Sequence, residues 1–275
     1  MSGITAVQRR LLTAARSLRL TWSLVVASAL PRALPAQATP VVASPATPDT
    51  LPPFERPNGA LLRTGSLSYV LSLIRSNGDL IPLGTRTVSV SEVSAGGTPS
   101  WLIAEGRHGT VVETTDSVTL TRADLVPVRW SASIGTSRVA ASFTRDSMFG
   151  GIETYQGRAS FGVATPLNAL LSAGMVERVI EMLALREGYR ASAALLVIEG
   201  QAPRAIAAEI VVDAIETVTV GSQLVECWRV MLRTATTEER LWVARDGARV
   251  VRSEQSLPTG VLRAELRPQV PRGPA

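Results

Sequence analysis

The residues that most often carry catalysis are scarce in this chain. His108 is the only histidine, Cys227 is the only cysteine, and all 28 basic residues are arginine, so lysine is absent. Without lysine, Schiff-base, pyridoxal-phosphate and Walker-type phosphate chemistry are excluded. One histidine and one cysteine cannot form the usual zinc site, and one cysteine cannot form an intramolecular disulfide. His108 follows a predicted strand, where we expect a solvated turn.

Carboxylates are the remaining catalytic groups, and two pairs stand out. Glu238 and Glu239 are adjacent in a predicted strand, so their side chains should point to opposite faces. Asp116 and Asp124 bracket a predicted strand and are expected in solvated turns. Because an acid–base pair of the glycosidase type needs convergent carboxyl groups, we predict no enzyme activity, no metal and no cofactor. A carboxylate-only hydrolase is the weakest hypothesis.

The aromatic and sulfur-containing side chains indicate binding more than catalysis. Four of the five tryptophans lie in or beside predicted strands, where they could line a lipophilic cleft or pack in the core. Methionine on a helix stripe adds a deformable apolar surface, although it is also common core filler. The candidate ligand-binding residues are Leu171, Met175, Met182, Trp101, Trp130, Trp228 and Trp242.

The helix expected to carry three of these residues is Thr165–Gly188. Thr165 is a suitable N-cap, Pro166 fits the first helical position, and Gly188 fits the C-terminal cap. Between them an apolar stripe recurs at spacings of three and four, while Glu177, Arg178 and Glu181 fall off it. The stripe consists of Leu167, Leu170, Leu171, Met175, Val179, Met182 and Leu183.

Period-two alternation predicts strands on both sides of this helix. The first strand alternates Leu67, Tyr69, Leu71 and Leu73 with mostly polar residues. Further strands are expected over 85–93, 101–105, 110–120, 126–134, 138–143 and 148–156, and then over 189–198, 205–220, 223–233, 238–244, 248–255 and 260–266. Residues 205–215 could be helical by propensity, but their valines and those that follow favour a strand. The fold class is mainly β (β+α): a strongly curved antiparallel sheet, or half-barrel, wrapped over one long helix.

The N-terminal region reads as an export signal. Residues 1–38 contain five arginines and no acid, an apolar run at Leu20–Leu30, and Ala36-Gln37-Ala38 as a small-x-small cleavage pattern. We expect cleavage after Ala38 and a periplasmic or secreted protein; retention as an anchor is the alternative. The rest of the chain has 23 arginines and 23 acidic residues, so the net charge of +5 comes from the leader. We therefore expect no nucleic-acid partner.

The amino-acid composition divides the chain into four segments. Residues 1–38 are the signal peptide, 39–58 a Pro-rich linker, 59–268 one β-rich domain, and 269–275 a disordered tail. The linker contains six prolines among Ala, Thr and Ser, which favours extended chain.

Several short motifs resemble an exported bacterial family known as a domain of unknown function. They include Ser117–Trp130, Phe143–Asp146, Leu185–Tyr189, Glu226–Trp228, Leu241–Gly247, Arg249–Glu254 and Gly260–Arg263. Members of that family are similar in outline to the lipoprotein carriers LolA and LolB, whose concave apolar face holds acyl chains. The resemblance implies an open half-barrel over one or a few helices and assigns no individual residues.

Two main hypotheses follow. In the first, the protein is a periplasmic non-enzymatic binding module that holds a lipophilic ligand or acyl chain between sheet and helix, with a lipid or lipoprotein as partner. In the second, it is a cell-envelope structural or interaction domain without a ligand cavity, and its partner is an envelope protein. They differ in whether an apolar cavity remains beside the helix.

Overall fold

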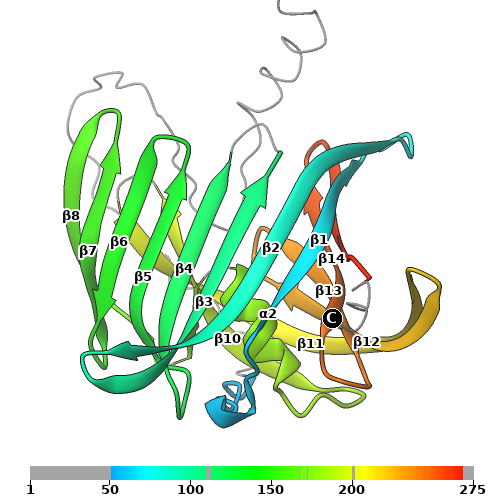
Figure 1. Cartoon of the computed structure of the whole chain (residues 1–275), viewed down its shortest axis with the longest axis horizontal. Coiled ribbons are helices and arrows are strands. Elements are labelled where there is room, and N and C mark those ends of the chain that lie inside the picture. The colour runs from blue at the N-terminus through cyan, green and yellow to red at the C-terminus, as the bar shows by residue number, and fades with distance from the viewer. Residues whose placement is uncertain (1–50, 110–112, 167, 172, 200–201, 269–275) are drawn as a thin grey trace, which may run out of the picture.

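The computed structural model describes residues 51–109, 113–166, 168–171, 173–199 and 202–268. Fifteen strands form one sheet in the order β8-β7-β6-β5-β4-β3-β2-β1-β15-β14-β13-β12-β11-β10-β9 (Figure 1). The signal peptide, the first part of the linker and residues 269–275 lie outside the described residues. The elements are η1 (Gly59–Leu61), β1 (Gly65–Ile74), β2 (Leu80–Ala95), β3 (Thr98–His108), β4 (Thr114–Thr121), β5 (Pro127–Ile134), β6 (Ser137–Phe143), β7 (Ser147–Thr154), β8 (Gly157–Ala164), β9 (Ala169–Leu170), α2 (Ala173–Glu181), β10 (Arg190–Glu199), β11 (Ala202–Val220), β12 (Gln223–Arg233), β13 (Glu238–Ala244), β14 (Val250–Leu257) and β15 (Gly260–Leu266).

Two meanders build the sheet and meet at its middle. The first runs outward from β1 to β8, and the second runs from β10 back to β15, which pairs with β1. These neighbours are antiparallel, whereas β9 and β10 are parallel. The mainly β fold with a curved sheet and one α-helix among the described residues agrees with the sequence prediction. Strand β8 was not predicted, although Phe161 and Val163 have the required alternation.

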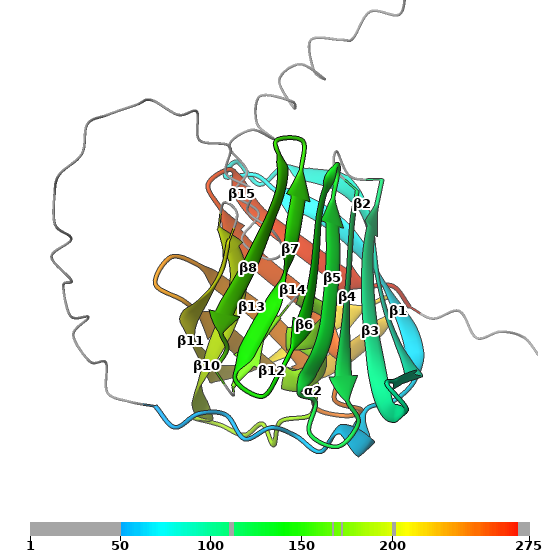
Figure 2. The same cartoon turned by 90° about the vertical axis from the view of Figure 1, so that its left-hand side faces the viewer.

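The sheet curves but does not close. Bulges with one extra residue interrupt the ladder in β2, β5, β11 and β14, and such bulges bend a strand and increase its twist. The end strand β8 comes into contact with β11 without joining it in the ladder. Figure 2 shows β8 beside β10 and β11 from the open side.

The core lies on one face of the sheet, where the alternate residues of each strand are buried. In β3 and β4 the buried residues alternate with half-buried ones, as period two requires. The largest fully buried side chains are Tyr69, Ile103, Leu120, Leu125, Met148, Ile152, Leu170, Leu171, Met175, Ile180, Ile198 and Ile210.

The helix is much shorter than predicted. It covers nine residues, Ala173–Glu181, instead of Thr165–Gly188. Ala169–Leu170 pairs instead with Ala194 and Leu195 of β10, so tertiary strand pairing overrides the local helical pattern. At the other end, Met182 and Leu183 donate to carbonyls three residues back, which tightens and ends the helix. Gly188 does have the left-handed conformation expected of it, at φ 69°, but in a later turn.

Residues 51–58, expected within the linker, are packed onto the domain. Phe54 is buried, and its N–H donates to the carbonyl of Ser192 at 3.0 Å. Arg56 donates to the carbonyls of Leu125 at 2.9 Å and Ala169 at 3.2 Å. From Leu51 on, therefore, this stretch belongs to the domain, along the edge seen in Figure 2. No helix in the described part of the chain is long and apolar enough to cross a membrane.

Candidate functional site

Helix α2 is buried on both of its faces. The apolar face carries Met175, Val176, Val179 and Ile180, each no more than 1% exposed. The opposite face carries Glu177, Arg178 and Glu181, which are only 1%, 7% and 7% exposed. These three residues fall off the apolar stripe, yet they are buried as well. Buried charged side chains must find hydrogen-bond partners.

Those partners form an ionic cluster between α2, β2 and β3. Arg86 donates to both carboxylate oxygens of Glu177, at 2.6 and 3.0 Å, and to Glu105 at 3.0 Å. The other oxygen of Glu105 accepts from Nε of Arg107 at 2.9 Å.

A second set of contacts ties α2 to β1 and β14. Arg178 pairs with Glu181 at 2.7 Å and donates to the hydroxyl of Tyr69 at 3.4 Å. Glu181 also accepts from the backbone N–H of Val250 at 2.6 Å. The Tyr69 hydroxyl in turn donates to the carbonyl of Val250 at 3.1 Å. The C-terminal part of the helix is thereby held by polar contacts as well as by packing.

Burial and neighbouring charges give the buried carboxyl groups very different pKa values. Burial alone would raise the pKa of Glu105, but Arg86 and Arg107 lower it to about 2. Burial raises the pKa of Glu181 to about 7, although Arg178 and the N–H of Val250 oppose the rise. For Glu239, which is 7% exposed, burial and then repulsion from Glu177 raise the pKa to about 8. Near neutral pH, Glu105 is ionised while Glu239 is mostly protonated.

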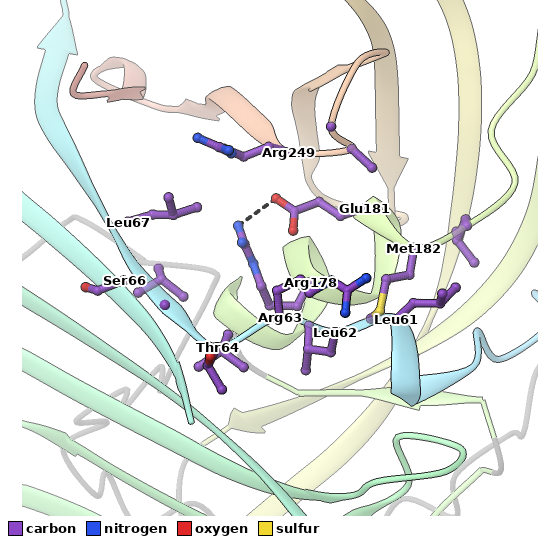
Figure 3. A pocket seen from close by; sticks show the side chains of 16 residues that line it. Leu61, Leu62, Arg63, Thr64, Ser66, Leu67, Arg178, Glu181, Met182 and Arg249 are labelled. Carbon is purple, nitrogen blue, oxygen red and sulfur yellow. Dashed lines mark ion pairs between the residues drawn. The ribbon is translucent and has the colours of Figure 1, made fainter. Parts of the chain in front are cut away.

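A pocket of about 580 Å³ opens at the C-terminal end of α2. Its walls come from the segment before β1, from β1 and β2, from the end of α2 and from the β13–β14 turn (Figure 3). The volume is within the range of small-molecule sites. Its apolar lining comprises Leu61, Leu62, Leu67, Val88, Val90, Met182 and Leu183, and its charged lining comprises Arg63, Arg178, Glu181 and Arg249.

A second hollow, of about 530 Å³, lies over strands β4–β8. Most of its side chains alternate with the buried ones, among them Ser117, Thr119 and Ser131, so it belongs to the other face of the sheet. Phe149 and Arg158 at its margin are exposed. Because it contains no buried charged side chain, it is the weaker candidate.

The predicted tryptophans do not converge on one site. Trp101 and Trp130 are buried core residues whose indole N–H groups donate to Gly59 O at 2.9 Å and Asp116 Oδ2 at 3.2 Å. Trp242 is opposite Arg252 and Arg229 in its neighbouring strands, whereas Leu241 and Val243 point to the other face. Trp228 is half-buried beneath the guanidinium of Arg245, 4.5 Å from its ring centroid.

The predicted helix-stripe residues divide between core and pocket. Leu171 and Met175 are completely packed, and the N–H of Leu171 lies 3.4 Å from the sulfur of Met175. Met182, just beyond the helix, is half-buried and lines the pocket. Of the seven candidates, Met182 is the one that contributes to this pocket.

The candidate chemical groups have mixed outcomes. Glu238 and Glu239 diverge as predicted: Glu238 pairs with Arg233 and Arg240, whereas Glu239 is buried. Asp116 was expected in a solvated turn, which is wrong, because it lies in β4, in phase with Val118 and Leu120, and is 6% exposed. His108 is exposed at the end of β3, as expected. Among the described residues no group of three His, Cys, Asp or Glu side chains could hold a metal ion.

The burial of Arg86, Glu105 and Glu239 was not predicted, although the sequence contains a signal for it. Each is two residues from buried apolar positions of its own strand: Arg86 from Val88, for example, and Glu239 from Leu241. A charged residue in phase with the apolar face of a strand must be buried. The charged turn Arg245–Arg249 is exposed, and its residues Gly247, Ala248 and Arg249 also line the pocket.

Comparisons with known proteins do not identify a family for this chain. No family model matches the chain, and no curated protein matches it by sequence. It is similar to a beta-barrel-like protein of the domain of unknown function DUF1849 from Brucella abortus, at 12% identity and a TM-score of 0.43, over 73% of this chain and 94% of that one. It is also similar to the hypothetical lipoprotein YmcC from Escherichia coli, at 13% identity and a TM-score of 0.32, over 78% and 88%. Neither likeness confirms the resemblance to LolA and LolB.

Proposed function

We propose that this protein is an exported, non-enzymatic binding module that holds a lipophilic ligand in the pocket at the end of α2. The observation that carries the proposal is the pocket of about 580 Å³, in which a continuous set of aliphatic and methionine side chains lies beside four charged ones. Ligand sites are typically concave and mostly apolar, with a small number of polar groups that fix orientation. The half-barrel would then act as a rigid support in which the sheet wraps over the helix.

A particular residue set supports a lipophilic occupant. Leu67 and Met182 are half-buried where they pack against the buried core, and Leu61 is 56% exposed. Covering such aliphatic surface stabilises a complex by about 25 cal/mol per Å². An acyl chain in this pocket would complete the burial that the fold leaves unfinished.

The alternative is a cell-envelope scaffold that binds protein partners only. It is favoured by the complete burial of Leu171, Met175 and Val179, which leaves no gap along the helix stripe itself. On that alternative the pocket at the helix end is only a solvated depression, and the functional surface lies elsewhere. The two functions are separated by whether the pocket binds apolar compounds.

The test is displacement of a neutral fluorescent apolar dye from the purified full chain, together with native mass spectrometry and lipid extraction. Met182→Trp fills the pocket and should weaken dye binding about tenfold or more. Leu80→Trp, at a position that is 62% exposed and away from the pocket, is the matched control and should bind normally. If the unmodified chain binds no dye and carries no lipid, the carrier function is wrong and the scaffold is favoured.

Export is tested separately. The proposed cleavage after Ala38 makes Thr39 the first residue of the mature protein. N-terminal sequencing of protein isolated from the periplasm or medium of an expressing bacterium should begin at Thr39. A chain that retains the leader in the membrane fraction would favour the anchor.

A further inference from the structure

We infer that the ligand of the α2 pocket is an anionic amphiphile, whose carboxylate or phosphate headgroup is bound by Arg178 and Arg249. This inference rests on the proposed function and assigns a ligand class to the same pocket. The shared chemistry is a single chain that ends in an oxyanion.

The first observation is an unfilled donor on Arg178. This side chain lines the pocket, and the residue is 7% exposed. Its NH2 group contacts Glu181 and Tyr69, but its Nε is buried and has no hydrogen-bond partner among the described residues. A buried donor without an acceptor is costly, so a ligand oxygen at this position would be favoured.

The second observation is the charge of the pocket lining itself. The lining includes three arginines, Arg63, Arg178 and Arg249, and one acidic residue, Glu181. Burial raises the pKa of Glu181 to about 7, so this carboxyl group is partly protonated at neutral pH. The charged lining therefore carries a positive excess, which an anionic headgroup would neutralise.

The third observation is the positive charge around the opening. Arg63 and Arg249 both line the pocket and are exposed. Among the described residues, neither of them forms an ion pair. Arg249 acts electrostatically on Glu181, whose pKa it lowers, and Figure 3 shows it on the same side of the pocket as Glu181. An incoming headgroup would therefore meet Arg249 next to the Arg178–Glu181 pair.

The aliphatic residues define the other end of the ligand. Leu61, Leu62 and Met182 lie together in Figure 3, away from Arg249. A ligand with a polar head at Arg249 and an aliphatic chain toward Met182 would match both ends of the pocket. A cationic head would be repelled by Arg63, Arg178 and Arg249, and a neutral head would leave the positive excess uncompensated.

The experiment measures competition with the neutral apolar dye on the full chain at pH 7, below the micelle concentration of each probe. The probes are dodecanoate, dodecyl phosphate, dodecanol and dodecyltrimethylammonium, with inorganic phosphate as a head without a chain. We expect the two anionic chains to bind at least about tenfold more tightly than dodecanol. The cationic chain should be weakest, and inorganic phosphate should not compete at the same concentrations.

Two variants localise the headgroup. Arg249→Gln should reduce the preference for anionic chains over dodecanol about tenfold. Arg245→Gln is the matched control, because Arg245 lies on the same turn but pairs with Glu226 and does not line the pocket. Arg178→Lys, which keeps the charge, should lower the preference for anionic chains over dodecanol further. Circular dichroism would show whether this variant at a buried position folds. If it does not fold, Arg249→Gln still tests the inference.

The outcomes separate the inference from the function on which it rests. Equal binding of dodecanol and the anionic chains, or an unchanged preference in Arg249→Gln, overturns the anionic headgroup and leaves the lipophilic carrier intact. Failure of every chain to displace the dye, or failure of the dye to bind, overturns the proposed function itself. Competition by inorganic phosphate alone at equal concentration would mean an anion site without a chain requirement, which also overturns the amphiphile.

Discussion

The two faces of α2 are buried to the same degree but by different means. The apolar face packs Met175, Val179 and Ile180 into the core of the sheet. The other face sets Glu177, Arg178 and Glu181 among Arg86, Tyr69 and the N–H of Val250. On the apolar face, the loss of stability on substitution depends gradually on the change in side-chain shape. On the charged face, stability depends on every partner being present, because removing one leaves a buried charge unpaired. The amphipathic pattern of α2 therefore distinguishes a face buried in the apolar core from a face buried among charged and polar groups. It does not mark a boundary between the protein interior and solvent.

The largest expected effect comes from removing the central cation of the ionic face. Arg86→Ala leaves Glu105 and Glu177 buried without their main partner, and we expect the free energy of unfolding to fall by about 3–5 kcal/mol. Urea denaturation at pH 7 measures it. Arg122→Ala breaks an exposed pair with Glu92, whose side chains are 48% and 51% accessible, and should cost less than about 1 kcal/mol. Equal losses in the two variants would mean that the buried pair is no more important than a surface one.

Truncation on the apolar face should cost somewhat less. Ile180 is completely buried, so Ile180→Ala should lower the free energy of unfolding by about 2–4 kcal/mol, and Ile180→Val by about 1 kcal/mol. Because no charge is lost, the deficit should be the same at pH 5 and pH 8. A deficit that changes strongly with pH would show that the two faces are energetically coupled.

The pH dependence of stability distinguishes the two faces most directly. The pKa of Glu239 rises from 4.5 to about 8 on folding, so the folded state holds this proton more tightly than the unfolded state. The free energy of unfolding should therefore fall as pH rises from about 4.5 to 8. Glu239→Gln mimics the protonated form and should be neutral at pH 5 but stabilising by about 1–3 kcal/mol at pH 8.5.

The adjacent residue provides the control for this pH effect. Glu238 faces the other way and pairs with Arg233 and Arg240, which lower its pKa although partial burial opposes them. Glu238→Gln should give no gain at pH 8.5. A similar gain from both substitutions would assign the effect to net charge and not to burial of Glu239.

The smallest effect is expected at the pocket opening. Arg249 is exposed and forms no ion pair among the described residues, so Arg249→Gln should change the free energy of unfolding by no more than about 0.5 kcal/mol. Thermal denaturation checks it. A loss above about 1 kcal/mol would mean that Arg249 belongs to the buried ionic cluster and not to the ligand site.

Much of the sheet could be predicted, and the site largely could not. Alternation located most strands, including the long β11 over a stretch that propensity leaves open to helix. The helix limits failed because Ala169 and Leu170 pair with β10, a contact that local spacing does not contain. The tryptophans, chosen for their chemistry, proved to be scattered over both faces of the sheet. Arg86, Glu105 and Glu239 were in phase with apolar neighbours, and a stricter use of that period would have identified them as buried.

The sequence by itself determined which residues of each strand share a face and that α2 has one apolar and one charged side. These properties follow from the repeats of strand and helix, which are fixed by backbone geometry. Tertiary structure alone decided that the charged side is also buried, that Arg178 and Arg249 meet across a pocket, and that this pocket lies at the end of the helix. Such contacts join residues far apart in the chain, 91 positions in the case of Arg86 and Glu177 and 109 in the case of Tyr69 and Arg178, and no local pattern encodes that distance.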